Sequence, residues 1–139
     1  MKRIVGAFEK VDFPDFGLFE VIAKVDTGAT SGSLHATHIK EILLPTNDTA
    51  LSFRPYGREP RVLLSEFTQK EVTSSNGITE LRYVIPTTIV IRGVQYPILI
   101  NLANRTKMKK GALIGRKFLR QHGFLVDSKK GTKYRSEVK

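Results

Sequence analysis

The fold of this chain is decided by Ala23-Lys24-Val25-Asp26-Thr27-Gly28-Ala29-Thr30, a strand-like run that ends in an Asp-Thr-Gly-Ala turn. Far along the chain lies a second informative stretch, Ala112-Leu113-Ile114-Gly115-Arg116-Lys117-Phe118-Leu119, in which an apolar run and a Gly-Arg pair lead into a helical pattern. In this order the two stretches predict a carboxylate on a turn and a strand-helix unit that supports it. The sequence holds a single Asp-Thr-Gly, so a site with two such carboxylates requires a second copy of the chain.

The Asp26 turn has the residue types that peptide hydrolysis by paired carboxyls requires. Two carboxyls held close together share one proton, so one can take a proton from water while the other protonates the carbonyl oxygen. Gly28 permits the close approach of a substrate or a second turn, Thr27 can hydrogen-bond to that turn, and Ala29 keeps the space small. Asp-Thr-Gly also forms an ordinary Asx turn, in which Asp26 accepts hydrogen bonds from its own backbone. The preceding strand and the later Gly-Arg helix favour the catalytic interpretation.

Strand-like patterns dominate the rest of the chain and predict an all-β fold with one short helix. Asn76-Gly77 indicates a hairpin, since both residues tolerate positive φ, and residues 92–95 indicate a second one. Pro86 and Pro97 are expected at strand starts or edges, because proline donates no ladder hydrogen bond. The predicted strands cover residues 3–8, 18–25, 37–44, 51–54, 61–72, 78–84, 87–91, 96–100 and 124–127, and the predicted helix covers 115–122 with Gly123 as its C-terminal stop.

Length and composition predict one domain without disulfides. The chain has 139 residues and no cysteine, which allows a core of its own and excludes disulfides and thiolate metal sites. Residues 1–8 lack the apolar segment of about 7–15 residues that marks a signal peptide. No run approaches the ~20 apolar residues of a membrane-spanning helix. We therefore expect a cytoplasmic protein.

The net charge of +10 is confined to the C-terminal part of the chain. Residues 1–104 hold 11 basic and 11 acidic residues, whereas residues 105–139 hold 12 basic residues and only Asp127 and Glu137 as acids. Such a segment attracts anions, so nucleic acid, an acidic peptide or an anionic surface can be its partner. A basic tail can equally be solvated and have no partner.

Several stretches of the sequence resemble a known bacterial family of retropepsin-like peptidases. This family is often labelled "ATP-dependent zinc protease", is associated with RimK and LysX ligases, and includes RimB-like proteins. No Gly-x-x-x-x-Gly-Lys-Ser/Thr loop occurs, so the ATP dependence in that label cannot reside in this chain. The similar stretches are Ala23-Lys24-Val25-Asp26-Thr27-Gly28-Ala29, Leu34-His35-Ala36, Val72-Thr73-Ser74-Ser75-Asn76-Gly77, Leu81-Arg82-Tyr83-Val84-Ile85-Pro86, and Ile114-Gly115-Arg116 through Phe124-Leu125-Val126-Asp127.

The resemblance implies a retropepsin-like acid-protease closed β-barrel with a hairpin flap and one short C-terminal helix, assembled as a homodimer. Residues 1–127 then form the protease domain and residues 128–139 a basic C-terminal tail. We expect no cofactor and no metal. The site residues that it implies are Asp26 as the catalytic acid of each subunit, Thr27, Gly28 and Ala29 as the active-site turn, Ser75, Asn76 and Gly77 as the flap, and Gly115 and Arg116 as a structural brace.

The resemblance also implies a substrate and a partner. Relatives are often fused or linked to ATP-grasp ligases that add glutamates to proteins, which implies an oligoglutamate or acidic tail as substrate. The basic segment fits such a tail independently, because Arg and Lys bind carboxylates. One departure concerns Arg116, because Thr30 stands where retroviral proteases place the Asp that pairs with this Arg. The basic residues expected to contact the substrate are Arg82, Arg105, Lys107, Lys109 and Lys110.

Three functions from different classes remain open on the sequence. The first is a dimeric aspartic endopeptidase that acts on acidic peptides, and the second is a non-catalytic basic module that binds RNA or a ribosome. Few aromatic residues accompany the basic ones (Phe118, Phe124 and Tyr134), so base stacking has weak support and nucleic acid is not the expected partner. The third is a metallopeptidase, because two histidines with a carboxylate can bind zinc. Its ligands would be His35, His38 and Glu41, although the His-Glu-x-x-His motif is missing.

Overall fold

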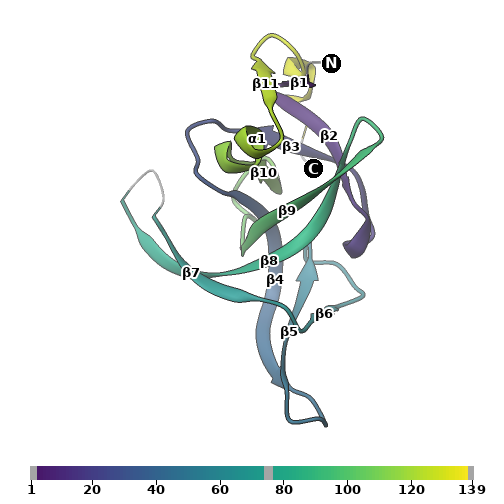
Figure 1. The fold of residues 1–139 in the computed structure, drawn as a ribbon, viewed down its shortest axis with the longest axis vertical. Coiled ribbons are helices and arrows are strands. Elements are labelled where there is room, and N and C mark those ends of the chain that lie inside the picture. The colour runs from purple at the N-terminus through teal and green to yellow at the C-terminus, as the bar shows by residue number, and fades with distance from the viewer. Residues whose placement is uncertain (1–2, 74–76, 138–139) are drawn as a thin grey trace.

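Strands make up most of the structure, a computed structural model that describes residues 3–73 and 77–137 (Figure 1). The prediction of an all-β fold with one short α-helix is confirmed. The elements in chain order are β1 (Arg3–Gly6), β2 (Phe8–Phe13), the 3-10 helix η1 (Pro14–Phe16), β3 (Leu18–Val25), β4 (Gly32–Leu43), β5 (Thr49–Pro55), β6 (Val62–Leu64), β7 (Thr68–Thr73), β8 (Thr79–Ile91), β9 (Val94–Ala103), β10 (Ala112–Ile114), α1 (Arg116–Gln121), β11 (Phe124–Asp127) and the 3-10 helix η2 (Thr132–Tyr134).

Six strands of the main sheet close into a ring. Neighbouring strands follow the order β10, β3, β2, β8, β9 and β4, and β10 also pairs with β4, which completes the circle. The pairs β10–β3 and β4–β9 are parallel, and the other four pairs of the ring are antiparallel. β5 and β6 continue the sheet from β4, and β7 continues it from β8, so these three strands lie outside the ring (Figure 1).

The core is filled by side chains that alternate along the ring strands. On β8, Ile85, Ile89 and Ile91 are buried, and the residues between them include partly exposed ones. On β9, Ile98 and Ile100 are buried in the same alternating pattern, and Leu99 between them is exposed. Successive side chains of a strand point to opposite faces, so this period of two directs one face of each strand into the core.

The turn between β8 and β9 is shorter than the predicted one over residues 92–95. Ile91 pairs with Val94, so only Arg92 and Gly93 remain in the turn. Both turn residues have positive φ, 51° and 79°. Two such residues form the type of tight turn whose twist matches that of the flanking strands.

The predicted strand over residues 61–72 is divided into β6 and β7. Between them the chain leaves the sheet, and Phe67 packs edge-on against Tyr83 on β8 with the ring centroids 5.9 Å apart. β7 then pairs with β8 as far as Thr73 and Thr79. The predicted hairpin is therefore present, with a shorter first strand than the sequence pattern indicated.

Pro86 and Pro97 lie within β8 and β9 and not at the starts of these strands. β7 pairs with β8 as far as Val84, and β2 pairs with it from Val90, so neither covers Pro86. β4 pairs with β9 only from Ile100 onward, so β4 does not pair with β9 at Pro97. Among the described residues each proline thus has a neighbour strand on one side only, where its missing N–H costs no ladder bond.

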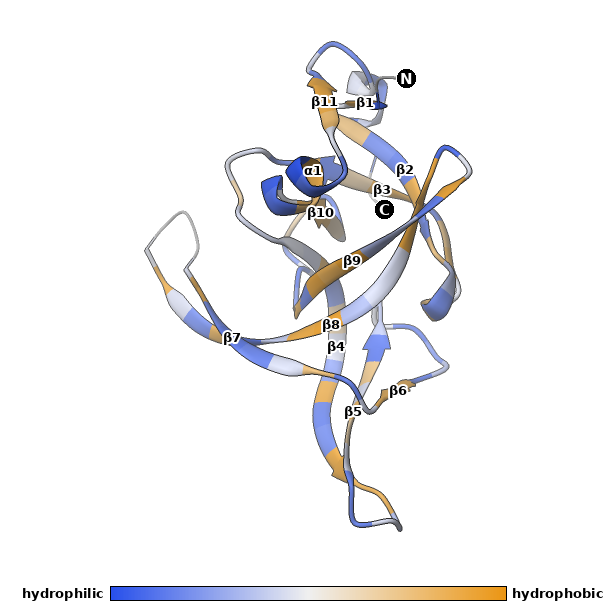
Figure 2. Cartoon of the chain, in the orientation of Figure 1, coloured by the Kyte–Doolittle hydropathy of each residue, from blue (hydrophilic) through white to orange (hydrophobic). Residues whose placement is uncertain are grey.

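Helix α1 is anchored on the ring through aromatic packing. Phe118 and Leu119 are buried, and the Phe118 ring lies 5.9 Å from that of Tyr96 on β9 and 5.7 Å from that of Phe124 on β11. Gly123 has φ of 68°, so the predicted C-terminal stop is confirmed. Figure 2 shows the rest of α1 mainly in hydrophilic colours, as expected of a helix with one buried side.

The segment after β11 folds back onto the first strands. β11 pairs in parallel with β1 in a separate two-stranded sheet at one end of the molecule (Figure 1). The N–H of Ala7 donates to the carbonyl oxygen of Lys130 at 2.8 Å. Gly131 lies so close to Phe8 that a Cβ at this position would be 2.0 Å from the Phe8 carbonyl oxygen. No helix in the described part of the chain is long and apolar enough to cross a membrane.

Candidate active site

Asp26 stands at the end of β3, where the parallel neighbour β10 fixes the backbone. The two strands pair up to Val25 and Ile114, and the Asp26 N–H donates to the Ile114 carbonyl oxygen at 2.9 Å. Asp26 Oδ1 accepts the N–H of Gly28 at 2.9 Å, and the Ala29 N–H donates to the Asp26 carbonyl oxygen at 3.2 Å. The Asx turn that the sequence allowed is therefore present, and it fixes the orientation of the carboxylate.

The turn that carries this carboxylate faces solvent. Asp26 is half-buried, whereas Thr27 and Gly28 are exposed. In Figure 1 the loop between β3 and β4 projects beside α1, on the side of the molecule toward which the β7–β8 hairpin extends. A turn that is held by its backbone and exposed at its tip can meet a second copy without rearrangement.

Arg116 supports the turn from the first residue of α1. Its Nη1 donates to the Gly28 carbonyl oxygen at 3.1 Å and, at 3.5 Å, to that of Thr27. Its Nη2 donates to Thr30 Oγ1 at 2.9 Å, and its backbone N–H donates to the Ala29 carbonyl oxygen at 2.9 Å. Where the sequence left the partner of Arg116 open, the structure provides a hydroxyl and backbone carbonyls in place of a carboxylate.

Two glycines allow backbones to touch behind the turn. A Cβ on Gly115 would lie 2.6 Å from the carbonyl carbon of Ser31. A Cβ on Gly32 would lie 2.7 Å from the Leu113 carbonyl oxygen. Real Cβ atoms do not approach this closely, so only glycine lets β10 and α1 pack against the loop after Asp26.

A polar cluster lies at the end of the β8–β9 pairing. Asn101 is only 2% exposed, and its Nδ2 donates to the Gly32 carbonyl oxygen at 2.7 Å and to Ser31 Oγ at 3.4 Å. Its Oδ1 accepts Arg82 Nη1 at 3.1 Å, and Arg82 Nε donates to Glu80 Oε1 at 2.8 Å. Asn101 thereby connects the Arg82 guanidinium to the loop that follows the Asp26 turn.

Arg105 adds a second guanidinium to this region. Its backbone N–H donates to His35 Nδ1 at 2.8 Å, and its Nε donates to the Lys110 carbonyl oxygen at 3.1 Å. Burial lowers the pKa of Arg105 and the positive charge of Arg82 lowers it further, while Tyr56 and, to a smaller extent, Asp26 act in the opposite direction. Arg105 therefore lies within electrostatic range of both Arg82 and the candidate catalytic acid.

Tyr56 and His35 lie beside Arg105. Their ring centroids are 6.0 Å apart in an edge-to-face arrangement. Burial raises the pKa of Tyr56 to about 12, so the phenol stays protonated near neutral pH. Burial also lowers the pKa of His35, and the charge of Arg105 acts in the same direction. Neutral His35 can therefore accept the Arg105 N–H through Nδ1, which fixes the start of the loop between β9 and β10.

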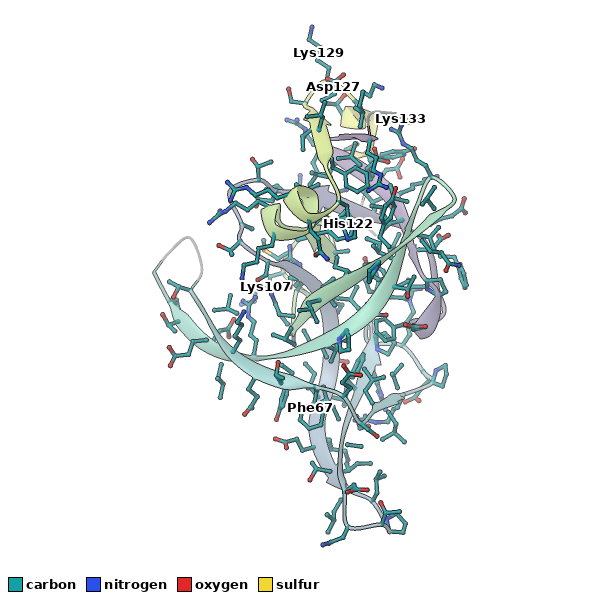
Figure 3. The ribbon with its side chains drawn as sticks, in the orientation of Figure 1. Phe67, Lys107, His122, Asp127, Lys129 and Lys133 are labelled. Carbon is teal, nitrogen blue, oxygen red and sulfur yellow. The ribbon has the colours of Figure 1, made fainter. Side chains whose placement is uncertain are left out.

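The predicted substrate-binding lysines differ in exposure. Lys107 and Lys109 are exposed on the loop between β9 and β10, and Figure 3 shows Lys107 between α1 and the β7–β8 hairpin. Lys110 is only 4% exposed, and its Nζ donates to the Tyr134 carbonyl oxygen at 2.6 Å. Burial lowers the pKa of Lys110. Its amine thus already has a partner in the C-terminal segment, and contact of Lys110 with a substrate stays a prediction.

The β7–β8 hairpin is the element predicted to act as a flap. Ser75 and Asn76 lie outside the described residues, and Gly77 has φ of 84°. The hairpin is held by the pairing of its strands and by the hydrogen bond between the hydroxyls of Thr73 and Thr79, 2.8 Å apart. Its role over a bound peptide stays a prediction.

The residues considered as metal ligands have other partners. His35 uses Nδ1 for the Arg105 N–H, and His38 Nδ1 lies 2.9 Å from Thr37 Oγ1. Glu41 accepts a hydrogen bond from the Tyr83 hydroxyl at 2.8 Å. Within residues 3–73 and 77–137 no group of three or more His, Asp or Glu side chains is arranged to hold a metal ion.

Sequence reasoning missed Asn101 and Glu80 as members of the site. Asn101 directly follows the apolar run predicted as a strand over 96–100. A polar residue that continues a buried strand needs hydrogen-bond partners, which is the signal that this amide has a specific role. Glu80 precedes Arg82 by two residues in a predicted strand, which places both side chains on one face. Both signals lie in the sequence, but neither gives the contact itself.

Comparison with known proteins gives a consistent family assignment. Two curated proteins named probable alpha-L-glutamate ligase are similar to the chain: that of Parasynechococcus marenigrum (strain WH8102) is 36% identical over 127 residues, and that of Shewanella pealeana is 30% identical over 120 residues. Each alignment covers 83% of this chain and 26% of the relative, so the chain spans about a quarter of the length of these proteins.

A solved structure and a family model cover nearly the whole chain. The crystal structure of a Legionella pneumophila protein of unknown function superposes with a TM-score of 0.73 and 28% identity, over 93% of this chain and 95% of that one. The family model described as retropepsin-like aspartic endopeptidase RimB matches residues 4–135, which include the Asp26 turn and the Gly115-Arg116 helix. The chain therefore belongs to the RimB-like family of retropepsin-like aspartic endopeptidases.

Proposed function

We propose that two copies of this chain form an aspartic endopeptidase that hydrolyses peptide bonds in acidic, glutamate-rich protein tails. The observation that carries the proposal is the Asp26 carboxylate, held by the Gly28 N–H on an exposed turn that Arg116 supports from behind. Membership of the RimB-like family supports the reaction class. The homodimer follows from the chemistry, because the chain contributes one Asp-Thr-Gly and the reaction uses two carboxyls.

In the proposed mechanism the two Asp26 carboxyls face each other across a two-fold axis. At short range both cannot be ionised, so the pair holds one proton. The ionised carboxylate takes a proton from the attacking water, and the protonated carboxyl donates its proton to the carbonyl oxygen of the substrate. The oxygen of that water bonds to the carbonyl carbon and forms a tetrahedral intermediate. The carboxyl that took the water proton then donates it to the leaving nitrogen, the C–N bond breaks, and the other carboxylate takes a hydroxyl proton from the intermediate, which restores the pair with one proton. The peptide lies between the paired turns and the β7–β8 hairpin of each subunit.

Two observations support an acidic substrate. The charges of Arg82 and Asp26 both act on Arg105, so at least one cation lies near the candidate catalytic acid. Lys107 and Lys109 add exposed cations on the loop that contains Arg105. Relatives that contain a similar segment are named alpha-L-glutamate ligases. We infer a functional link, in which a ligase extends a protein with glutamates and this peptidase removes them.

The alternative of an RNA-binding module has weaker support in the surface chemistry. Of the aromatic residues near the basic ones, Phe118 is buried and its ring packs against those of Tyr96 and Phe124. Few exposed rings are therefore left among the described residues on which bases could stack. A steep loss of nucleic-acid affinity with added salt would be the sign of that function, whereas the peptidase should prefer polyglutamate over RNA of equal charge.

The first prediction concerns Asp26→Asn and tests the proposed function. Wild type and variant are incubated with a peptide that ends in a run of glutamates, and the products are identified by mass spectrometry. Wild type should shorten the peptide, and the variant should be slower by roughly 10²–10⁴-fold or more, since it loses its acid and base. The melting curve should not change, because an Asn side-chain oxygen can still accept the Gly28 N–H.

The matched control is Asp48→Asn, the same chemical change at an exposed position between β4 and β5. This control should cleave at the wild-type rate. Cleavage by purified Asp26→Asn at the rate of the control would refute the assignment of Asp26. Equal cleavage of a glutamine-tailed peptide would refute the acidic substrate and leave the peptidase activity standing.

A further inference from the structure

We infer that Glu80 occupies, within the free chain, the place at Arg82 that an acidic side chain of the substrate takes when it binds. The inference rests on the proposed function and identifies Arg82 and Glu80 as specificity-determining residues of the same site. In the free protein Glu80 neutralises Arg82, and a substrate carboxylate displaces it. The contact therefore sets the affinity for acidic peptides and leaves neutral peptides unaffected.

The guanidinium of Arg82 is fixed on one side and reversibly occupied on the other. Asn101, buried and bonded to the Gly32 carbonyl oxygen, accepts Arg82 Nη1 and so positions the group. Arg82 Nε and Nη2 both donate to the same oxygen of Glu80. A guanidinium binds a carboxylate best through both carboxylate oxygens, so the Glu80 contact leaves a better geometry available to another carboxylate.

The exposures of Arg82 and Glu80 would allow a substrate carboxylate to replace Glu80 at Arg82. The Arg82 side chain is 18% exposed, while that of Glu80 is 55% exposed. Glu80 can therefore rotate into solvent without any change in the backbone, whereas Arg82 stays in place. An ion pair of this exposure contributes little to stability, so its replacement by a substrate carboxylate is nearly neutral for the fold.

Positive charge exceeds negative charge around this pair. Lys70 on β7 is the direct partner of Arg82 across the hairpin, so the two side chains share a face. Arg105 is close enough for the charge of Arg82 to add to the effect of burial and lower the pKa of Arg105 further. Glu80 is the carboxylate bonded to Arg82, and the charge of Asp26 acts on Arg105. Glu80 therefore neutralises only part of the positive charge of Lys70, Arg82 and Arg105, and a substrate carboxylate would neutralise more of it.

A hollow beside the ion pair has room for the side chain that we propose. Its volume is about 270 Å³, and it lies where β4, β8 and β9 come together. Apolar residues suit the methylene groups of a glutamate, and Arg82 lies among the lining residues to receive the carboxylate. The lining residues that matter here are Ile39, Glu80, Arg82, Tyr83, Leu102 and Asn104.

The second prediction tests this inference by binding and not by cleavage. All variants are made on the inactive Asp26→Asn chain, and fluorescence anisotropy follows a labelled oligoglutamate peptide and its oligoglutamine counterpart. Glu80→Gln should lower the Kd for oligoglutamate by about two- to fivefold, the size expected for release of a partly exposed ion pair. Arg82→Gln should raise it by about tenfold or more, because a charge-assisted contact is lost. Neither should change the Kd for oligoglutamine.

The matched control is Glu71→Gln, an exposed residue of β7 that pairs with Leu81 and so lies on the face of the hairpin opposite to Arg82. This control changes the net charge equally without touching Arg82. Equal effects of Glu80→Gln and Glu71→Gln, or a tightening of both peptides by Glu80→Gln, would overturn the inference. In the active dimer, Glu80→Gln should lower KM for the acidic peptide at constant kcat. Failure of these tests leaves hydrolysis by Asp26 standing, because that activity is measured separately.

Discussion

Arg116 shows how a single residue can support the Asp26 turn without an ion pair. Its guanidinium reaches the carbonyl oxygens of Thr27 and Gly28 on one side and the Thr30 hydroxyl on the other. All three acceptors are uncharged, so none of them gains or loses a proton as the pH changes. The contacts of Arg116 with the Asp26 turn should therefore not depend on pH.

The third prediction is that Arg116→Lys lowers kcat by about tenfold while the melting temperature changes little. An ammonium on a flexible stem cannot hold acceptors in two directions, and the loss of about 1.4 kcal/mol of positioning corresponds to a factor of ten in rate. Lys117→Gln, an exposed change on the same helix, is the control. An unchanged kcat in Arg116→Lys, measured on the glutamate-tailed peptide, would show that the turn needs no such support.

At the scale of elements, local patterns were readable from the sequence and contacts between distant strands were not. β3 occupies the predicted residues because its pattern is local, whereas β4 begins at Gly32 and not at residue 37. Gly32 has little intrinsic preference for a strand. It is placed there by pairing with Ile100 and by its close approach to Leu113.

The candidate site also has one part that the local sequence encodes and another that depends on contacts between distant strands. The Asp26 turn is encoded within a few neighbouring residues, so the sequence alone indicates it. The grouping of Arg82, Asn101 and Arg105 depends on where β8 parts from β9 and on the path of the loop after β9. The burial of Lys110 could not be predicted for the same reason, because its amine contacts the C-terminal segment that folds back.

The fourth prediction measures how firmly that segment is docked. Gly131 has φ of 74° and contacts the Phe8 carbonyl oxygen, whereas Gly93 has φ of 79° and open space within 4 Å of the point that a Cβ would occupy. Gly131→Ala should therefore cost about 2–3 kcal/mol in the free energy of unfolding, and Gly93→Ala only about 1–2 kcal/mol, the cost of backbone strain alone. Urea denaturation measures both. Equal losses of unfolding free energy in the two variants would mean that the C-terminal segment moves away from Phe8 at no energetic cost.

At the scale of the whole molecule, the positive charge serves two separate regions. Lys107 lies on the side of the β7–β8 hairpin, while Lys129 and Lys133 lie at the end of the molecule that carries β1 and β11 (Figure 3). Only part of the net charge of +10 can therefore contact a peptide at Asp26. The remainder acts at longer range, where it raises the rate at which acidic partners arrive and makes that rate sensitive to salt.

The fifth prediction follows from the shared site of the proposed dimer. When wild type is mixed and re-equilibrated with an equal amount of Asp26→Asn, only about a quarter of the dimers contain two intact acids, so the activity per wild-type chain should fall by about half. Mixing with the active Asp48→Asn control should cause no such loss. Specific activity should also fall on dilution as dimers dissociate. Activity that stays proportional to the wild-type chain in both experiments would show that a single subunit suffices.

The position of the two prolines has a consequence for the behaviour of the protein in concentrated solution. In the described part of the chain no second strand pairs with β8 at Pro86 or with β9 at Pro97, although Thr87 hydrogen-bonds to Asp15 and the Pro97 carbonyl oxygen lies 3.2 Å from His122 Nε2. A strand margin without a neighbour is where a foreign strand could add and begin lateral growth of the sheet into aggregates. Pro86 and Pro97 interrupt the row of amide donors there, so an incoming strand finds a gap in each margin. Uncontrolled growth along these edges is thereby disfavoured, which is compatible with the proposed pairing of two Asp26 turns as the specific association of this protein.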